Sequence, residues 1–514
     1  MPSAPSYRRP RRPPAHLRTK TGCLTCRKRR KKCDEQADSC GNCSRRWLEC
    51  IWPSPASNAA SDEAISELPL QVQPRTTVAI SPSVRGISWD QPVATELQIP
   101  PLYPEPTTLP FYAGIIPTAS SPLFDLLRTK WLRQLIRPRA YDSLIEFYHQ
   151  EAMVMAMHIP FYMHSLLACC AAEYPVNDAN VNAREELSRL SRKHYIRAIT
   201  GLREALGGDE PNIQRDAIIR TVLMLCIFER AKPWPSSGVG AHLSGLAQLI
   251  QSESVWQALG HPVSTVGTAL RRLVLEGFIF HTATSVPFQP LSDQQSNLDE
   301  AMRLAQSRLG GMFSEGTREN PDSPVLGVEP QLFVLVRELS LMHREYEQSN
   351  RHLQRGETLS TMQEQLSIYR RIYWTGLRNF PNSSLEDRTS AFPAYTDAIG
   401  TNQPFAGPLL YITAAGILLS DISGNTDVVD HISPALSIPE LVLEGVRLVR
   451  QLEPTKDYYA EYYGWPIYVL AKFVTHEQDR KCLLDQVNAF WQETRSGTMA
   501  RLADILGNGN RISM

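Results

Sequence analysis

The chain of 514 residues is long enough for two or three domains, and its 42% hydrophobic and 21% charged content is ordinary for a protein with a sizeable core. Its formal net charge is zero, but residues 1–52 hold 14 Lys and Arg against 4 Asp and Glu, so the remainder is acidic. No apolar run approaches the roughly 18 to 20 residues that cross a bilayer, and the first 20 residues lack the apolar core of a secretory signal. We therefore expect no membrane span, a reducing intracellular compartment, and a polyanion as the partner of the N-terminal region.

Residues 1–19 are rich in arginine and proline and predict a disordered basic arm. Its charges suit contact with a nucleic-acid backbone or a nuclear import receptor, and the sequence does not separate these two roles. A merely solvated charged tail is the third interpretation.

Six of the ten cysteines follow within 28 residues at the spacing C-x2-C-x6-C-x6-C-x2-C-x6-C. They are Cys23, Cys26, Cys33, Cys40, Cys43 and Cys50, and a shift of 17 residues maps the first three onto the last three. In a reducing compartment such clustering indicates metal ligation rather than disulfides. Six thiolates can complete two tetrahedral zinc sites if two of the sulfur atoms bridge the ions. Because so few apolar residues are available for a core, we expect this module to fold only with metal.

A run of six basic residues lies inside the first half of the cysteine repeat. It consists of Arg27, Lys28, Arg29, Arg30, Lys31 and Lys32. Two zinc ions and six thiolates sum to a charge of −2, so this run exceeds what the cluster needs, and the excess favours a polyanion. A short helix beginning near Cys26 would fit the major groove of DNA, where arginine can bind guanine O6 and N7 together.

The cysteine spacing, together with "CRKRRKKCD", closely resembles that of the fungal binuclear zinc-cluster transcription factors. The resemblance implies two Zn²⁺ ions per chain, with Cys23 and Cys40 as the bridging thiolates, and double-stranded DNA as the partner. It also implies a nuclear regulator of RNA polymerase II transcription, more often an activator, that reads CGG-type triplets. Two departures are the loop "DEQADS", which lacks the usual proline, and arginine in place of lysine at position 30.

The same resemblance implies different DNA contacts for different residues of the basic run. It places Arg29 and Arg30 at base edges and Arg27 and Lys32 on phosphates. The zinc module and the basic run together predict a binuclear zinc-cluster DNA-binding domain at residues 20–52.

Residues 53–122 contain 13 prolines and no sustained period of 2 or 3.6, which predicts a disordered Pro/Ser-rich linker. No apolar heptad follows the zinc module, so the dimerising coiled coil of many relatives is not expected here. Pairing of two chains, if it occurs, would use the helical domain that follows.

Residues 123–514 predict a large all-helical regulatory domain, so the overall fold class is all-α. The strongest amphipathic pattern lies at 183–205, and the segment from Val222 to Phe228 is apolar on all sides and predicts a central buried helix. Segments such as "HSLLACCAAEY" and "HLSGLAQLI" weakly resemble the regulatory domain of the same family. Further helices are expected near 140–173, 212–231, 242–252, 265–280, 330–348, 359–374, 406–420, 440–453 and 480–495.

The remaining cysteines and the histidines of this domain lie on apolar helical patterns, and we interpret them as structural. They are Cys169, Cys170, Cys226 and Cys482, with His164, His194 and His242. Motifs of hydrolases, metalloproteases and nucleotide-binding loops are absent, so no catalytic residue and no enzymatic activity are expected. The alternative hypothesis is a helical enzyme or adaptor that a structural zinc module tethers to nucleic acid. Control of metabolic or secondary-metabolite genes, through the transcription machinery, is an expectation from the family alone.

Overall fold

A computed structural model describes the chain in two compact units, residues 1–98 and residues 99–514. In the first unit it describes residues 22–28, 33–35, 40, 43 and 50–52. In the second it describes residues 120–137, 140, 142–174, 181–207, 212–232, 236–252, 265–289, 295–310, 323–349, 356–378, 406–424, 436–454 and 461–507. The predicted arm at 1–19 and nearly all of the predicted linker at 53–122 lie outside these residues.

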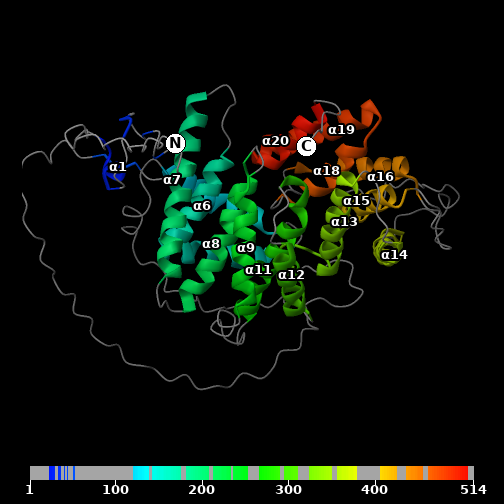
Figure 1. The fold of residues 1–514 in the computed structure, drawn as a ribbon, viewed down its shortest axis with the longest axis horizontal. Helices are drawn as coiled ribbons and strands as arrows, with labels where there is room; N and C mark the ends of the chain where they lie inside the picture. The colour runs from blue at the N-terminus through cyan, green and yellow to red at the C-terminus, as the bar shows by residue number, and fades with distance from the viewer. Residues whose placement is uncertain are drawn as a thin grey trace, which may run out of the picture. The chain divides into compact units, whose positions relative to one another are not determined.

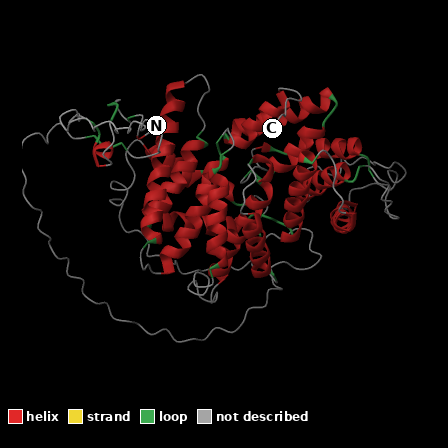
Figure 2. Cartoon of the chain, viewed as in Figure 1, coloured by secondary structure: helices red, strands yellow, loops and turns green. Residues whose placement is uncertain are grey.

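Every regular element among the described residues is a helix, which confirms the all-α fold class (Figure 2). The first unit contains α1 (Leu24–Lys28). The second unit contains α4 (Ser121–Thr129), η4 (Trp131–Leu135), α5 (Asp142–His158), α6 (Pro160–Ala172), α7 (Val181–Leu206), α8 (Asn212–Arg230), α9 (Gly238–Gln251), α11 (Thr265–Thr284), η5 (Val286–Phe288), α12 (Gln295–Leu309), α13 (Pro330–Gln348), α14 (Gly356–Arg378), α15 (Ala406–Ile422), α16 (Ile438–Arg450), α18 (Gly464–Phe473), α19 (Glu477–Thr494) and α20 (Gly497–Gly507).

The helical signal near 140–173 corresponds to two helices, α5 and α6, which separate at Ile159. Pro160 is the first residue of α6, where the missing N–H of proline leaves no helical hydrogen bond unmade. Ile159 adopts an extended conformation before it, as residues that precede proline usually do. Four further α-helices, α4, α12, α18 and α20, have no counterpart among the predicted ranges.

The long helix α7 packs lengthwise against α6 (Figure 1). Most of its charged side chains are exposed. Its buried side includes Ala198, Leu202 and Ala205, which follow the predicted period. A β-carbon at Gly201 would lie 2.8 Å from Cβ of Phe161 on α6, so the absence of a side chain permits this close approach.

The helix α8 is the central helix of the second unit, as its continuous apolar run predicts. All described residues from Ala217 to Ala231 are buried, and α8 packs against α6, α9 and α11. The later helices pack as a second group, in which α15 lies against α16 and α19 against α20 (Figure 1).

A buried polar cluster joins the end of α8 to the last helices. Arg230 Nε donates to Glu461 Oε2 at 3.0 Å, and both side chains are 4% exposed. The hydroxyls of Ser496 and Thr498, beside the start of α20, donate to the same carboxylate at 2.7 and 2.8 Å. Residues far apart in the sequence are therefore held together in the interior.

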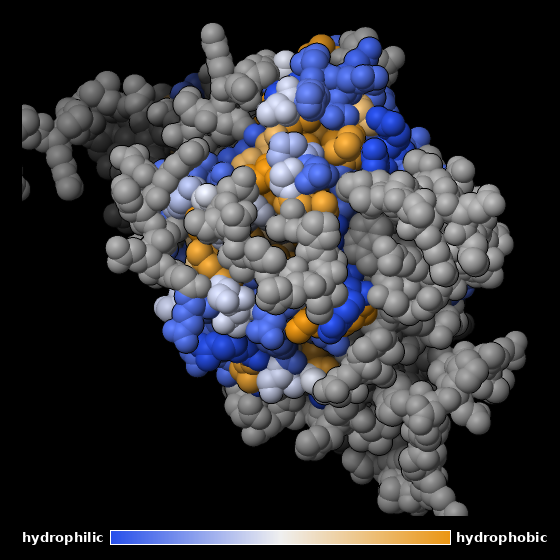
Figure 3. Space-filling view, turned by 90° about the vertical axis from the view of Figure 1, so that its right-hand side faces the viewer, coloured by the Kyte–Doolittle hydropathy of each residue, from blue (hydrophilic) through white to orange (hydrophobic). Residues whose placement is uncertain are grey.

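In the ranges that the structure describes, no helix combines the length and the apolar character needed to span a bilayer. On the face drawn in Figure 3, hydrophilic residues cover much of the described surface, and apolar residues emerge between them in small groups. The large apolar side chains that are exposed in the second unit lie apart from one another: Val181 and Leu206 at the two ends of α7, Ile368 on α14 and Leu443 on α16. Single apolar residues of this kind are normal on protein surfaces.

Candidate metal centre

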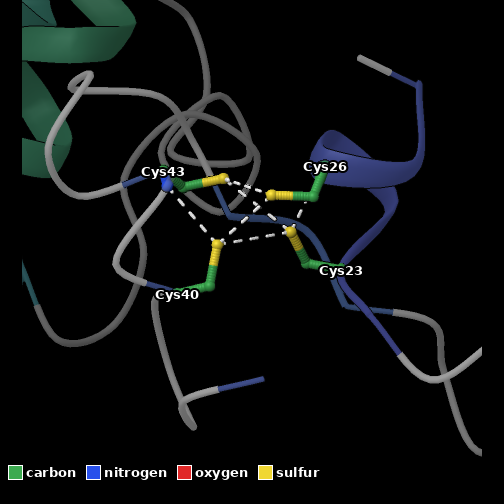
Figure 4. A group of neighbouring side chains, drawn as sticks. All are labelled: Cys23, Cys26, Cys40 and Cys43. Carbon is green, nitrogen blue, oxygen red and sulfur yellow. Dashed lines mark hydrogen bonds between the residues drawn. The ribbon is translucent and has the colours of Figure 1, made fainter. Parts of the chain in front are cut away.

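Four cysteine sulfur atoms form a compact group in the first unit (Figure 4). The Sγ atom of Cys23 lies 3.7 Å from Cys40 Sγ and 3.7 Å from Cys43 Sγ. The Sγ atom of Cys26 lies 3.5 Å from Cys40 Sγ and 3.9 Å from Cys43 Sγ. A zinc–sulfur bond of about 2.3 Å in a tetrahedral site places neighbouring sulfurs about 3.8 Å apart. The four sulfurs thus have the spacing of zinc ligands.

The backbone around the cysteines repeats its contacts with the 17-residue period of the sequence. Four N–H groups donate to sulfur, in two equivalent pairs: Cys23 N to Cys33 Sγ (3.4 Å) with Cys40 N to Cys50 Sγ (3.2 Å), and Cys26 N to Cys23 Sγ (3.3 Å) with Cys43 N to Cys40 Sγ (3.4 Å). The third cysteine of each half therefore returns to the first cysteine of the same half. All six predicted ligands belong to one cluster.

Local contacts fix α1 against the end of the module. Leu24 N donates to Ile51 O at 2.6 Å, and Ile51 N donates to Thr25 Oγ1 at 3.3 Å. A β-carbon at Gly22 would lie 2.6 Å from Cβ of Cys33, so glycine allows the chain to pass the third cysteine. The hydrogen bond between Ile51 and Thr25 joins residues 26 positions apart, so the local sequence pattern does not predict it.

The donor set fits a metal ion by its chemistry as well as its spacing. Burial, together with contacts to neighbouring thiols, raises the pKa of Cys26 to about 12 and that of Cys43 above its ordinary range. Thiols packed this way resist losing their protons together, whereas a divalent cation supplies the charge that stabilises thiolates. A carboxylate oxygen of Asp34 lies within 4.8 Å of the Cys33 and Cys40 sulfurs. Asp34 is not among the ligands predicted from the sequence.

The basic run begins at the exposed end of α1. Arg27 and Lys28 form the last turn of this helix, and both side chains are exposed. The other four predicted DNA-binding residues, Arg29, Arg30, Lys31 and Lys32, lie outside the described residues.

The other cysteines do not form a second cluster among the residues that the structure describes. Cys169, Cys170 and Cys226 are fully buried in the helical core, as expected. Cys482 is only half-buried, and its sulfur lies 3.4 Å from Arg450 Nε.

The three histidines singled out from the sequence have protein partners. His194 Nε2 lies 2.9 Å from Ser120 Oγ, and its Nδ1 lies 3.0 Å from Nδ1 of His164. His242 Nε2 lies 3.0 Å from the hydroxyl of Tyr195. Burial lowers the pKa of His194 to about 3 and that of His164 and His242 to about 4, so these rings are neutral near pH 7. Their structural interpretation is confirmed.

Family models match both units. The fungal Zn(2)-Cys(6) binuclear cluster domain matches residues 21–59, and the fungal specific transcription factor domain matches residues 146–508. No solved structure matches the chain.

The curated relatives match mainly over short segments. Transcription factor lfc1 of Flammulina velutipes is 47% identical over 47 residues, which cover 9% of this chain and 17% of that protein. The transcriptional regulatory protein moc3 of Schizosaccharomyces pombe is 40% identical over 76 residues, 15% of each chain. The Zn(2)-C6 fungal-type transcription factor afumD of Aspergillus fumigatus is 39% identical over 62 residues, 12% of this chain and 17% of that protein. This chain thus covers a small part of these relatives.

The family and these relatives are transcription factors, not enzymes. The binuclear cluster domain that matches the first unit is one that binds two zinc ions, and the cysteine group of the structure is able to hold metal. The second family model covers more than half of the chain. The chain therefore belongs to the fungal transcription factors that join a Zn(2)-Cys(6) binuclear cluster to a fungal specific transcription factor domain.

Proposed function

We propose that this chain acts in the nucleus as a sequence-specific regulator of RNA polymerase II transcription and reads CGG-type triplets through α1 and the basic residues after it. The observation that carries the proposal is the position of α1. This helix begins at the sulfur cluster and ends at the exposed cations Arg27 and Lys28. A metal cluster that anchors one end of a helix leaves its basic end available for the major groove.

All six cysteines hold the two zinc ions in this proposal, with Cys23 and Cys40 as the bridging ligands. Two contacts support these two residues as bridges. The Cys23 thiol interacts with the Cys50 thiol of the opposite half, and the Cys40 thiol interacts with the Cys33 thiol of the opposite half. A bridging sulfur must reach ligands of both ions, so contacts across the two halves of the repeat support this assignment.

Within the basic run, Arg29 and Arg30 contact base edges, Arg27 and Lys32 contact phosphates, and Lys28 and Lys31 add positive charge. Arginine binds guanine in two places at once, which makes its loss specific to sequence. A cation on a phosphate strengthens binding to every sequence alike.

The test compares Arg30→Ala with Lys32→Ala in the zinc-loaded full chain. Arg30→Ala is expected to cost about 1 to 3 kcal/mol on a CGG-containing duplex and to relax the base preference. Lys32→Ala should weaken specific and random duplexes equally and reduce the salt dependence. Arg189→Ala is the control, because Arg189 is an exposed residue of α7 and its substitution also removes one positive charge from the chain. Equal losses on both duplexes for both variants would refute this division of roles.

Zinc stoichiometry tests the ligand assignment independently of DNA. Native mass spectrometry of the full chain should show two zinc ions, and Cys40→Ser should reduce that number. A single zinc ion in the unmodified chain would overturn the bridged arrangement.

The second unit serves as a regulatory domain that pairs two chains and contacts the transcription machinery. Four of the six exposed large apolar side chains among the described residues lie in this unit, which supports it as the part that pairs. Gel shifts with one triplet or two triplets at graded spacings should show tighter binding to paired triplets, and a monomer in sedimentation would contradict pairing. We propose metabolic or secondary-metabolite genes as targets, to be checked by mapping genomic binding sites and the transcripts that change on deletion.

A further inference from the structure

A cavity lies inside the second unit, between η4, α5, α6, α8 and α11. Its volume is about 40 Å³. Its walls are mostly aliphatic and aromatic, with Leu223 and Ile227 from α8, Val274 from α11, and Ala152 from α5. None of its lining residues is acidic, and the only charged one is Arg220. A space of this size holds a few water molecules or a small organic molecule.

Arg220 places a cation in this apolar wall. Its side chain is 3% exposed, the Tyr162 hydroxyl interacts with it, and one of its terminal nitrogens, Nη2, has no hydrogen-bond partner. The carboxylate of Asp216 lies 3.1 Å from Nε and balances the charge, but Asp216 is itself 22% exposed. Buried N–H groups without partners are rare and unfavourable, and a guanidinium remains charged at all ordinary pH values. Nη2 of Arg220 therefore remains as a donor for a molecule in the cavity.

Tyr148 and Tyr162 also line the cavity, and two further groups add to its polar surroundings. His281 lines the cavity, its Nδ1 has no hydrogen-bond partner, and burial holds its pKa well below the usual range, so the ring is neutral. Glu151 is 6% exposed and lies near Arg220, and burial raises its pKa. The positive charge of Arg220 is thus the feature that a polar ligand would meet within the cavity itself.

We propose that this cavity binds a small monocarboxylate, whose carboxylate accepts hydrogen bonds from Arg220 and whose alkyl group packs against Leu223, Ile227 and Val274. A charge-assisted hydrogen bond between a guanidinium and a carboxylate is strong, and an apolar wall with few polar groups is typical of small-molecule sites. Because α6, α8 and α11 all line the cavity, a bound molecule would stabilise their packing. This inference does not depend on DNA binding.

Sodium butyrate is the probe, titrated into the zinc-loaded full chain and compared with sodium chloride at equal ionic strength. Butyrate should raise the melting temperature in a saturable manner and give a saturable heat of binding in calorimetry, because a ligand of the folded state stabilises it. 1-Butanol and butylammonium chloride, which match the chain length without the carboxylate, should have no such effect.

Two variants test the site from different sides. Arg220→Met removes the donors, and Ala152→Leu fills the cavity while leaving Arg220 in place. Each should weaken butyrate binding by about tenfold or more, as expected for loss of a hydrogen bond to a charged group or of the space itself. Arg337→Met is the matched control, since Arg337 is also 3% exposed and ion-paired, to Asp299 at 2.8 Å, but does not line this cavity.

The proposal fails if butyrate gives no saturable effect beyond that of chloride. It also fails if both variants bind butyrate as well as the unmodified chain does, or if butanol acts as strongly as butyrate. The first result would mean that water fills the cavity, and the last that it is only an apolar space.

Discussion

Arg230 and Glu461 form an ion pair away from solvent, with both side chains 4% exposed. Removing one partner of such a pair leaves the other buried and uncompensated. We expect Glu461→Gln to lower the free energy of unfolding by about 3 to 5 kcal/mol, measured by urea denaturation of the full chain.

The control for this substitution is Glu146→Gln. Glu146 pairs with Arg133 at 2.7 Å, but the two side chains are 42% and 49% exposed. Solvent already screens this pair, so its loss should change stability by less than about 1 kcal/mol. Equal effects of the two substitutions would show that burial of the Arg230 pair is energetically unimportant.

The three buried, neutral histidines should make the protein less stable as the pH falls. Burial lowers the pKa of His164 and His242 to about 4 and that of His194 to about 3, compared with about 6.5 in an unfolded chain. The unfolded chain therefore binds more protons below pH 6.5. Stability is complete above that pH and should decline by about 1 to 2 kcal/mol per histidine as the pH falls to about 5.

Urea unfolding at several pH values between 7 and 5 measures this decline. His242→Gln should make it shallower by the contribution of one histidine, because an amide can still pair with the Tyr195 hydroxyl without taking up a proton. An identical slope for the variant would show that His242 takes up no extra proton on unfolding.

At the level of helices, two glycines offer a direct comparison. A β-carbon at Gly201 on α7 would meet Phe161 Cβ at 2.8 Å, whereas a β-carbon at Gly245 on α9 would have nothing within 4 Å. Gly201→Ala should therefore destabilise the protein by about 1 to 3 kcal/mol. Gly245→Ala should stabilise it by about 0.5 to 1 kcal/mol, because alanine favours a helix.

Thermal melting of both variants measures the difference. If both substitutions raise the melting temperature, α6 and α7 are not packed as closely as their glycine contact indicates.

Periodicity predicted most helices but not all of them. It placed α13 at 330–348, where apolar and charged residues alternate in helical order. It did not identify α18, because every described side chain from Gly464 to Ala471 is buried and the segment has no polar face to reveal a period. It merged α5 with α6, since the apolar pattern continues through Pro160. A helix that is buried on all sides, or a break between two helices that leaves the apolar pattern unchanged, cannot be predicted from periodicity alone and requires knowledge of the tertiary packing.

The two units of the whole molecule depend on different stabilising interactions. The first has a cluster of cysteines with little else that is apolar, whereas the second has an extensive apolar core. Zinc binding supplies the folding free energy of small zinc modules. We expect a chelator to abolish DNA binding and leave the main thermal transition of the helical unit unchanged, as followed by circular dichroism.

Restored binding on addition of zinc is the control for irreversible damage. Loss of the helical transition together with zinc would show that the two units do not fold independently.

The candidate metal ligands could be proposed from the sequence because their order along the chain contains the information. Cys23 to Cys50 lie within one short segment, so spacing alone indicates a shared site. The cavity beside Arg220 could not be predicted in this way. Ala152, Arg220 and Gly277 meet only when α5, α8 and α11 pack, and nothing in the local pattern of any one helix marks the contact.

The buried cluster around Arg230 predicts how a truncating mutation near the end of the gene would behave. Ser496, just before α20, and Thr498, within its first turn, donate to Glu461, which adopts a left-handed backbone conformation with φ of 63°. A nonsense mutation just before Ser496 would remove these donors and α20 while leaving the reading frame of the zinc cluster intact. Such an allele would encode the proposed DNA-binding domain joined to a destabilised regulatory domain. In a diploid or heterokaryon it should compete with the normal product for target sites and so be dominant, whereas loss of the zinc cluster should be recessive.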